Sequence, residues 1–348
     1  MRRLDLFELT GGFVRQKQHG TLVTARIYPR DSLLTSRQMR AVADIAERHG
    51  ERVVLLTASR AIEVPHIADT DQEPVRRALQ QAGIDLRAGR GREAEAADFD
   101  GPDRSLPPDS PQPYPVRLPI HPVPVRVLRS LAGVAESLGN GNLRLTSRQG
   151  IEILAIRPSK FEAVKARLDE NYLSPGVTGP RGRSATWCEG PLLCPHAQYD
   201  NLSLARRLDE LIFGRDLPRP LTACVSACHR ECALPAENDI AVMGNRDAGK
   251  NGYSIWIGGR AGRGTRKPLQ LVKFIPDDET YKVLHVIRIC LEFYRDQGKP
   301  GEAIADTFQR TGLDPLRTEL GILLSTSTPT GVKMPPREGG GGSHTTGM

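Results

Sequence analysis

The chain has 348 residues, of which 39% are hydrophobic and 34 are glycine, a composition typical of a folded protein that excludes wholesale disorder. Its 48 Lys and Arg against 41 Asp and Glu give a formal charge of +7, which suits an anionic ligand or an acidic partner. Scattered arginines and an aromatic content of only 5% argue against a nucleic-acid surface. Because no run of 18 apolar residues occurs and the N-terminus lacks the apolar core of a signal peptide, we expect a cytoplasmic protein with no membrane contact.

The N-terminal part of the chain predicts a strand, a helix, a strand and a helix in turn. Residue alternation favours a strand at 21–28, helical apolar spacing favours a helix at 36–50, and a β-branched run favours a strand at 52–64. A second helix is expected at about 72–83. The same order of elements then returns at 116–125, 127–139, 142–156 and 159–171.

An internal repeat explains this return. The segment LTASRAIEV at 56–64 aligns without a gap with LTSRQGIEI at 145–153, which gives a period of 89 residues. Such a period is too long for a solenoid, and the unit is present only twice. We therefore expect two halves that pair about a pseudo-twofold axis, the alternative being two coincidental segments of the same type.

Composition also suggests where the domains lie. Residues 87–115 are rich in Gly and Arg, then acidic, then rich in Pro, as is typical of a linker. A glycine- and arginine-rich turn at 258–268 and helical stretches near 278–297 and 300–312 follow later. The predicted units are a first half at 1–86, a linker at 87–115, a second half at 116–173, a further domain at 174–334 and a disordered tail at 335–348.

The further domain contains every cysteine of the chain, at 188, 194, 224, 228, 232 and 290. Five of them lie within 45 residues, a density that is unusual for inert structural cysteines and that lacks the spread of a disulfide framework. The spacings Cys188-x5-Cys194 and Cys228-x3-Cys232 suit loops around an iron–sulfur cube better than a zinc knuckle. Zinc and buried structural cysteines are the alternatives.

At this point the sequence resembles the sulfite/nitrite reductase superfamily, whose members carry sirohaem and a [4Fe-4S] cluster. The segments that carry the resemblance, in chain order, are GFVRQKQHG, LTSRQMRAVADIAERHG, LRLTSRQGIEI, TGPRGRSATWCEGPLLCPHAQ, LPRPLTACVSACHRECALPAENDIAVMG and WIGGRAGRGTRKP. The resemblance implies an α+β fold with two pseudo-symmetric ferredoxin-like halves forming one domain, followed by a mixed α/β [4Fe-4S]/sirohaem domain.

Motif positions carry the family's cluster ligands onto four cysteines of this chain. The implied metal ligands are Cys188, Cys194, Cys228 and Cys232. Cys232 would also bridge to the sirohaem iron, whereas Cys224 would pack on a strand and Cys290 would belong to a helical core.

The same resemblance implies cationic side chains that hold the anionic cofactor and substrate, because a guanidinium binds carboxylates bidentately and keeps its charge. The implied cofactor contacts are Arg15, Lys17, Arg26, Arg148, Gln149, Arg181, Arg183, Gly259, Arg260, Arg263, Arg266 and Cys232. Among them Arg26, Arg148 and Arg183 are the candidate catalytic residues. His121, His196 and His229 are candidate proton donors, although a single histidine is more often structural.

The implied activity is reduction of a small anionic substrate, sulfite or nitrite, with electrons from a ferredoxin-like donor, since the chain shows no flavin or nicotinamide motif. Three alternatives stay open: a tetrapyrrole-modifying relative of the precorrin-3B synthase type, a reductase of another substrate, and a non-catalytic electron-relay subunit.

Three departures from the family pattern concern positive charge. The 87–115 linker is too short for the degenerate domain copy that supplies anion-binding lysines, so these would be absent or would come from a homo- or heterodimer partner. Ser59 stands where the second repeat has Arg148, and Thr24 stands where many relatives have an arginine. These departures leave the identity of the substrate open.

Overall fold

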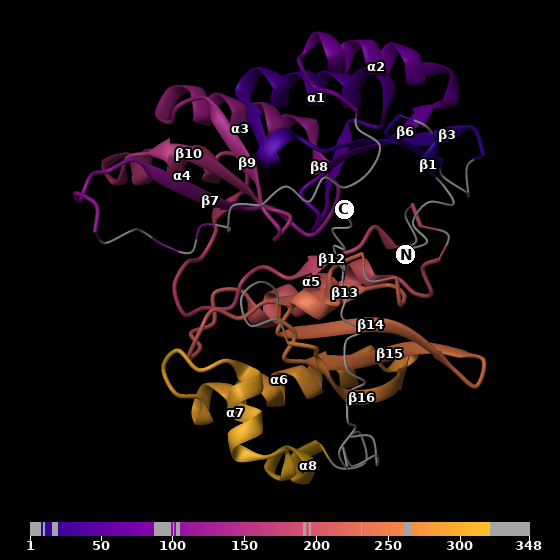
Figure 1. The fold of residues 1–348 in the computed structure, drawn as a ribbon, viewed down its shortest axis with the longest axis vertical. Helices are drawn as coiled ribbons and strands as arrows, with labels where there is room; N and C mark the ends of the chain where they lie inside the picture. The colour runs from indigo at the N-terminus through magenta and orange to yellow at the C-terminus, as the bar shows by residue number, and fades with distance from the viewer. Residues whose placement is uncertain are drawn as a thin grey trace, which may run out of the picture.

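The structure is a computed structural model in which residues 8–9, 11–15, 20–86, 99, 101, 105–190, 193–194, 196–230, 232–260 and 266–320 are described. The predicted tail at 335–348 and most of the first half of the predicted linker lie outside these residues. Figure 1 shows two lobes: an N-terminal lobe with β1–β11 and α1–α4, and a C-terminal lobe with β12–β16 and α5–α8. In the described part of the chain no helix is long and apolar enough to cross a membrane.

The N-terminal lobe is built from two similar halves. The first half comprises β1 (Glu8–Leu9), β2 (Phe13–Arg15), β3 (Leu22–Ile27), β4 (Leu33–Thr35), α1 (Ser36–His49), β5 (Val53–Leu56), β6 (Ile62–Ala68) and α2 (Gln72–Gln81). The second half comprises β7 (Gln112–Arg117), β8 (Val123–Pro124), α3 (Val125–Leu138), β9 (Asn142–Leu145), β10 (Ile151–Ile156), α4 (Phe161–Asp169) and β11 (Ser174–Pro175).

The predicted repeat is present in the backbone. Helices α1 and α3, and strands β5 and β9, start 89 residues apart. Even the rare left-handed conformations recur at this spacing, with φ of 58° at Arg60 and 54° at Gln149, and of 60° at His66 and 58° at Ala155. Left-handed φ is uncommon outside glycine, so its recurrence at matching positions shows that both halves share one backbone path.

Each half contributes a strand to the sheet of the other. Strand β4 pairs with β9, where Leu34 lies opposite Leu143, and β8 pairs with β5, where Val54 lies opposite Val123. The resulting sheets have the orders β1-β2-β3-β6-β5-β8 and β11-β7-β10-β9-β4. A single apolar core runs through both halves, so neither half buries its apolar residues without the other.

The helices of this lobe cover the outer side of the two sheets, as the indigo and magenta ribbons of Figure 1 show. Helix α1 starts with a capping box, in which Thr35 accepts from the Gln38 N–H and Gln38 accepts from the Thr35 N–H. Helices α1 and α3 both end at a glycine because the chain passes close to a neighbouring backbone. A Cβ atom on Gly139 would lie 2.5 Å from the Leu154 oxygen, and one on Gly50 would lie 2.9 Å from the Pro65 oxygen.

The C-terminal lobe has one mixed sheet in the order β12-β13-β14-β15-β16. Its strands are β12 (Thr186–Trp187), β13 (Ala223–Ser226), β14 (Ile240–Asp247), β15 (Lys250–Ile257) and β16 (Leu269–Pro276), and its helices are α5 (Asn201–Ile212), α6 (Thr280–Gln297), α7 (Ile304–Thr311) and α8 (Asp314–Leu320). Strands β12, β13 and β14 run parallel, and β14–β16 run antiparallel. Leu55 and Ile120 of the N-terminal lobe join the apolar core of this lobe and so connect the two.

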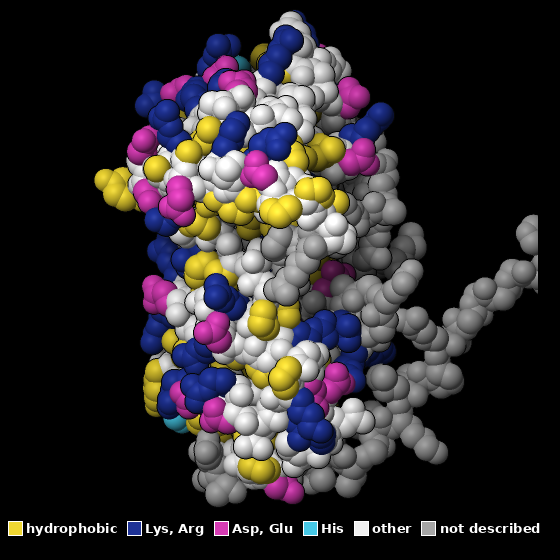
Figure 2. All heavy atoms as spheres, turned by 90° about the vertical axis from the view of Figure 1, so that its left-hand side faces the viewer, with side chains coloured by type: hydrophobic (Ala, Val, Ile, Leu, Met, Phe, Trp, Pro, Cys, Tyr) yellow, Lys and Arg dark blue, Asp and Glu magenta, His cyan; other side chains and the backbone are white. Residues whose placement is uncertain are grey.

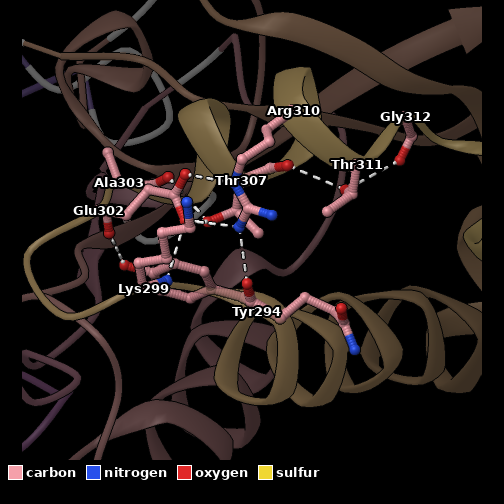
Figure 3. A network of polar contacts seen from close by, with 9 residues as sticks. Tyr294, Lys299, Glu302, Ala303, Thr307, Arg310, Thr311 and Gly312 are labelled. Atoms are coloured by element: carbon pink, nitrogen blue, oxygen red, sulfur yellow. Dashed lines mark hydrogen bonds and ion pairs between the residues drawn. The ribbon is translucent and has the colours of Figure 1, made fainter.

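The C-terminal helices are held by a polar network around the Glu302 carboxylate (Figure 3). This carboxylate accepts from Arg310 at 2.8 and 2.9 Å, from the Thr307 hydroxyl at 3.0 Å and from the Lys299 N–H at 2.9 Å. The Tyr294 hydroxyl donates to the Glu302 carbonyl at 2.6 Å. These donors, with Arg310 foremost, lower the pKa of Glu302 to about 2.

We expect the substitution Glu302→Gln to lower stability at neutral pH but not in strong acid. A folded-state pKa below the ordinary value of 4.5 means that the ionised form stabilises the fold above that pH and that this contribution disappears as the pH falls toward about 2. Denaturant unfolding of both proteins from pH 7 to pH 2 checks this, and a difference that persists undiminished at pH 2 would contradict it.

Candidate functional site

Two of the four predicted cluster cysteines begin loops at one edge of the C-terminal sheet. Cys188 directly follows β12 and Cys228 follows β13, and these two strands pair in parallel, with Trp187 opposite Val225. Because parallel neighbours end at the same edge, their outgoing loops start side by side. Backbone hydrogen bonds hold Cys188 to Val225 at 3.2 Å and Cys194 to Gly190 at 2.9 Å.

The thiols influence one another electrostatically in two pairs, Cys188 with Cys232 and Cys194 with Cys228. Burial raises the pKa of Cys188 to about 12, and the Cys232 thiol adds to the rise. Burial also raises the pKa of Cys194, and the neighbouring Cys228 thiol contributes to this rise. None of the chain's six cysteines forms a disulfide.

The polar groups around Cys188 fit a thiolate ligand. The Ala227 N–H donates to the Cys188 sulfur at 3.2 Å, and the Asn201 side-chain amide donates to the same sulfur at 3.4 Å. Donors directed at sulfur favour the thiolate, the form that binds iron in an iron–sulfur cluster. Within the described stretches no group of three or more His, Cys, Asp or Glu is placed to hold a metal ion, so the four-cysteine ligand set stays a prediction.

The two other cysteines are buried where the sequence places them. Cys224 lies within β13, opposite Ala241 of β14, and is fully buried. Cys290 lies fully buried in α6 and belongs to the apolar core of the C-terminal lobe.

Arg26 connects the first half of the N-terminal lobe to the cysteine loop. It lies on β3 opposite Glu63 of β6, with which it forms an ion pair, and its Nη2 lies 3.5 Å from the carboxylate of Glu189, the residue after Cys188. Burial, and then the neighbouring Glu63, raises the pKa of Glu189 well above its ordinary value. Sequence reasoning missed the buried Glu63 and the half-buried Glu189 because such acids are recognisable only once their neighbours are known.

Arg148 and Arg183 line one cavity of about 650 Å³ together with Arg60 and Arg117. Residues Ser184, Thr222 and Glu237 of its wall precede β12, β13 and β14 respectively. The cavity therefore lies at the amino ends of the three parallel strands, whereas the cysteines follow the carboxyl ends of β12 and β13.

The cavity arginines differ in their hydrogen-bond partners, which are an amide, backbone carbonyls and a carboxylate. Arg148 donates to the Asn238 side chain at 3.0 Å, and Arg183 donates to the carbonyls of Gly179 and Arg181 at 2.9 and 3.2 Å. Burial lowers the pKa of Arg183 to about 10. Arg117 pairs with Asp209 and lies over the Phe213 ring. Arg60 was not predicted as a site residue. The alignment of the two repeats, which places Arg60 opposite Gln149, could have pointed to it.

Several predicted cofactor contacts have other partners in this structure. Arg15 pairs with Asp69 at 3.2 Å, Arg181 with Asp216 at 3.1 Å and Arg266 with Asp306 at 2.5 Å. Arg260 forms an isolated bridge with Arg266, and a Cβ atom on Gly259 would lie 2.6 Å from the Asn238 oxygen. The amide of Gln149 bonds backbone groups of Leu56 and Trp187. Lys17 and Arg263 lie outside the described residues.

The three candidate histidines are dispersed over the chain. His121 Nδ1 lies 2.6 Å from the Pro122 oxygen, and His229 Nε2 lies 3.1 Å from the Asn245 side chain. His196 lies two residues after Cys194, and its backbone N–H donates to the Cys194 sulfur. The histidines therefore have separate surroundings, and His196 is the one that contacts a thiol through its backbone.

Comparison with known proteins gives matches to two family models. Residues 14–82 and 123–171 match the nitrite/sulfite reductase ferredoxin-like half domain, and residues 178–327 match the nitrite and sulphite reductase 4Fe-4S domain. The two halves and the 4Fe-4S domain thus follow one another in the order that the sequence predicts.

Relatives and solved structures point the same way. The chain is 28% identical to one of the subunits of the anaerobic sulfite reductase of Salmonella typhimurium over 144 residues, which are 37% of this chain and 42% of that protein. It is 24% identical to the assimilatory-type sulfite reductase of Nitratidesulfovibrio vulgaris over 176 residues, which are 50% and 76% of the two chains. The NirA protein of Mycobacterium tuberculosis has the same fold, with a TM-score of 0.68, 13% identity and coverage of 88% and 90%.

The matched stretches span less than half the length of the first curated relatives, at 47, 23 and 42% of those proteins. Together the α+β fold, the duplicated half domain and the 4Fe-4S domain show that the chain belongs to the sulfite/nitrite reductase superfamily, whose members carry sirohaem and a [4Fe-4S] cluster.

Proposed function

We propose that this protein reduces sulfite, or nitrite, in a multi-electron reaction at a coupled sirohaem and [4Fe-4S] centre, with electrons from a ferredoxin-type donor. The observation that carries the proposal is the gathering of cysteine loops at the carboxyl ends of β12 and β13, beside Arg26 of the N-terminal lobe. A sulfite reductase subunit and an assimilatory-type sulfite reductase among the relatives support sulfite as the first substrate to test.

Cys188, Cys194, Cys228 and Cys232 would hold the cluster, and Cys232 would also be the protein's ligand toward the sirohaem. When bound, the two cofactors together supply electrons one at a time to a small anion. The Ala227 N–H and the Asn201 amide stabilise negative charge on the Cys188 sulfur. The parallel pairing of β12 with β13 keeps the cysteine loops in register.

The arginines divide between two places, and we assign them different roles. Arg26, beside the cysteine loop, orients an anion near the cluster, with Glu63 and Glu189 holding its guanidinium. Arg148 and Arg183, in the cavity at the opposite ends of the strands, bind a carboxylate of a larger anion. Such fixed donors suit anions because they do not need to reorganise on binding.

We also propose a partner subunit. The 87–115 segment is too short to contain a further domain, and we propose that a partner subunit supplies the cationic groups that a second domain copy would contribute. A relative of this chain is itself named as a subunit, which supports this arrangement.

The first experiment is the visible spectrum of anaerobically purified protein, with iron counted and the tetrapyrrole extracted. We expect the bands of a chlorin-type macrocycle and about five irons per chain, four from the cluster and one from sirohaem. Turnover of sulfite and nitrite with a chemical reductant then ranks the substrates. About four irons without an extractable tetrapyrrole would refute the proposed reductase.

The ligand assignment predicts different outcomes for two neighbouring cysteines. We expect Cys232→Ser to lower the iron content to at most about one per chain or to uncouple the two cofactors, because it removes the shared thiolate. The matched control is Cys224→Ser, within strand β13, which should retain the spectrum. Thermal unfolding of both variants separates cofactor loss from misfolding, and loss of the cluster in Cys224→Ser alone would overturn the assignment.

If the electron donor is an acidic ferredoxin, the reduction rate should depend on salt concentration. Figure 2 shows Lys and Arg side chains on both lobes of one face, with acidic side chains between them, and the whole chain carries a net charge of +7. Steering of an acidic ferredoxin by these charges weakens as salt screens them. We expect the ferredoxin-driven rate to fall roughly threefold or more from low to high ionic strength, while the rate with a small neutral reductant stays constant. Equal salt effects on both rates would argue against such a donor.

A further inference from the structure

We propose that Gln149 is a positioning residue that holds strand β12, and with it Cys188, against the N-terminal lobe. The inference rests on the proposed function in one respect, namely that Cys188 is a cluster ligand. Motif position alone would make Gln149 a cofactor contact, and the structure assigns its side chain to backbone groups instead.

Three hydrogen bonds define the contact. The Gln149 Nε2 donates to the Leu56 oxygen at 2.6 Å and to the Trp187 oxygen at 2.9 Å. The Trp187 N–H donates to the Gln149 Oε1 at 2.7 Å. One side-chain amide thus bonds both backbone groups of Trp187 and the last residue of β5, and so joins two sheets.

The Gln149 amide occupies the place of a missing strand. Strand β12 is the edge of its sheet, with β13 on one side only. Edge strands present unpaired N–H and C=O groups on their free side. At Trp187 the Gln149 amide satisfies both, as a neighbouring strand would, and Trp187 is fixed from two directions immediately before Cys188.

The backbone at Gln149 is built to deliver the amide there. A tight turn is closed by the Thr146 N–H to the Gly150 oxygen at 3.1 Å and by the Gln149 N–H to the Thr146 oxygen at 3.2 Å. The Thr146 hydroxyl accepts from the Gly150 N–H at 3.0 Å. With φ at 54°, Gln149 adopts the left-handed conformation, which glutamine seldom takes outside such turns.

The first half of the N-terminal lobe provides an internal comparison. Its equivalent turn is closed by the Thr57 N–H to the Ala61 oxygen and by the Arg60 N–H to the Thr57 oxygen, with φ of 58° at Arg60. Arg60 nevertheless lines the arginine cavity at the amino ends of the parallel strands. The turn itself therefore does not require glutamine, and in the second copy the glutamine at this place makes the contact to β12.

The Gln149 contact helps to fix the start of the cysteine loop. The Cys188 N–H donates a hydrogen bond to the Val225 carbonyl on one side, and the Cys188 carbonyl accepts from Asn201 at 2.8 Å. The Gln149 contact ties the residue before Cys188 to the sheet of the first half through Leu56, and the longer contact of Arg26 with Glu189, at 3.5 Å, follows Cys188. Loss of the amide should leave the fold in place but loosen the first ligand relative to the N-terminal lobe.

The test uses Gln149→Met, which keeps the length of the side chain but has no amide. The matched control is Gln38→Ala, another glutamine of the same lobe, whose side chain bonds the backbone of Thr35 and Gly83 at the start of α1. Hydrogen exchange of the cofactor-free protein is followed in peptides that contain Trp187. We expect exchange there to accelerate about 5- to 30-fold in Gln149→Met and not in Gln38→Ala.

A second variant and a second readout complete the design. Asparagine tolerates the left-handed backbone, but its side chain is one methylene too short to reach Trp187. Gln149→Asn should therefore show the same faster exchange as Gln149→Met, and it replaces that variant if Gln149→Met folds poorly. In anaerobically purified protein, both Gln149 variants should show an altered electron paramagnetic resonance spectrum of the cluster and faster iron loss to a chelator. Unchanged exchange at Trp187, or faster exchange with an unchanged cluster spectrum, would overturn the inference. A wild-type protein without a cluster would refute the proposed function, and the exchange result would still decide the Gln149 contact.

Discussion

The parallel pairing of β12 with β13 is the constraint on which the site depends. Two strands that run in the same direction end at one edge, so Cys188 and Cys228, roughly 40 positions apart along the chain, start adjacent loops. Strand β12 contributes only Thr186 and Trp187, too few residues for a stable edge by themselves. Its position is secured from both sides, by β13 through the sheet and by Gln149 through a side-chain amide.

The N-terminal lobe shows how a duplicated backbone comes to serve an asymmetric site. Glu63 and Glu152 occupy equivalent positions of the two halves, and both are fully buried. A buried carboxylate needs a cationic partner, and each has a cross-strand arginine. The arginine differs, however: Arg26 comes from β3 in the first half, and Arg144 comes from β9 in the second. Arg26 also contacts Glu189, and so the first half presents the arginine of its pair to the cysteine loop.

The same asymmetry separates the two groups of candidate residues. Arg26 and the cysteines lie at the carboxyl ends of the parallel strands, and Arg60, Arg148 and Arg183 lie in the cavity at the amino ends. The arginines are therefore divided between the two ends of the parallel strands. In the function proposed here, the first place would take a small anion and the second the carboxylates of a larger one.

Much of the fold could be predicted from the sequence because it depends on local patterns of residues. The gapless alignment of 56–64 with 145–153 predicted the duplicated halves, and apolar spacing predicted α1 and α3. The density of cysteines predicted a domain that binds a cluster. These features depend on residues close together in the chain, so a linear pattern records them. The tertiary structure alone decided which arginines share a cavity, that Glu189 lies beside the buried Glu63, and that the Gln149 amide hydrogen-bonds to Trp187. Those contacts join residues from different elements, and their partners become neighbours only when the strands pair and the lobes meet.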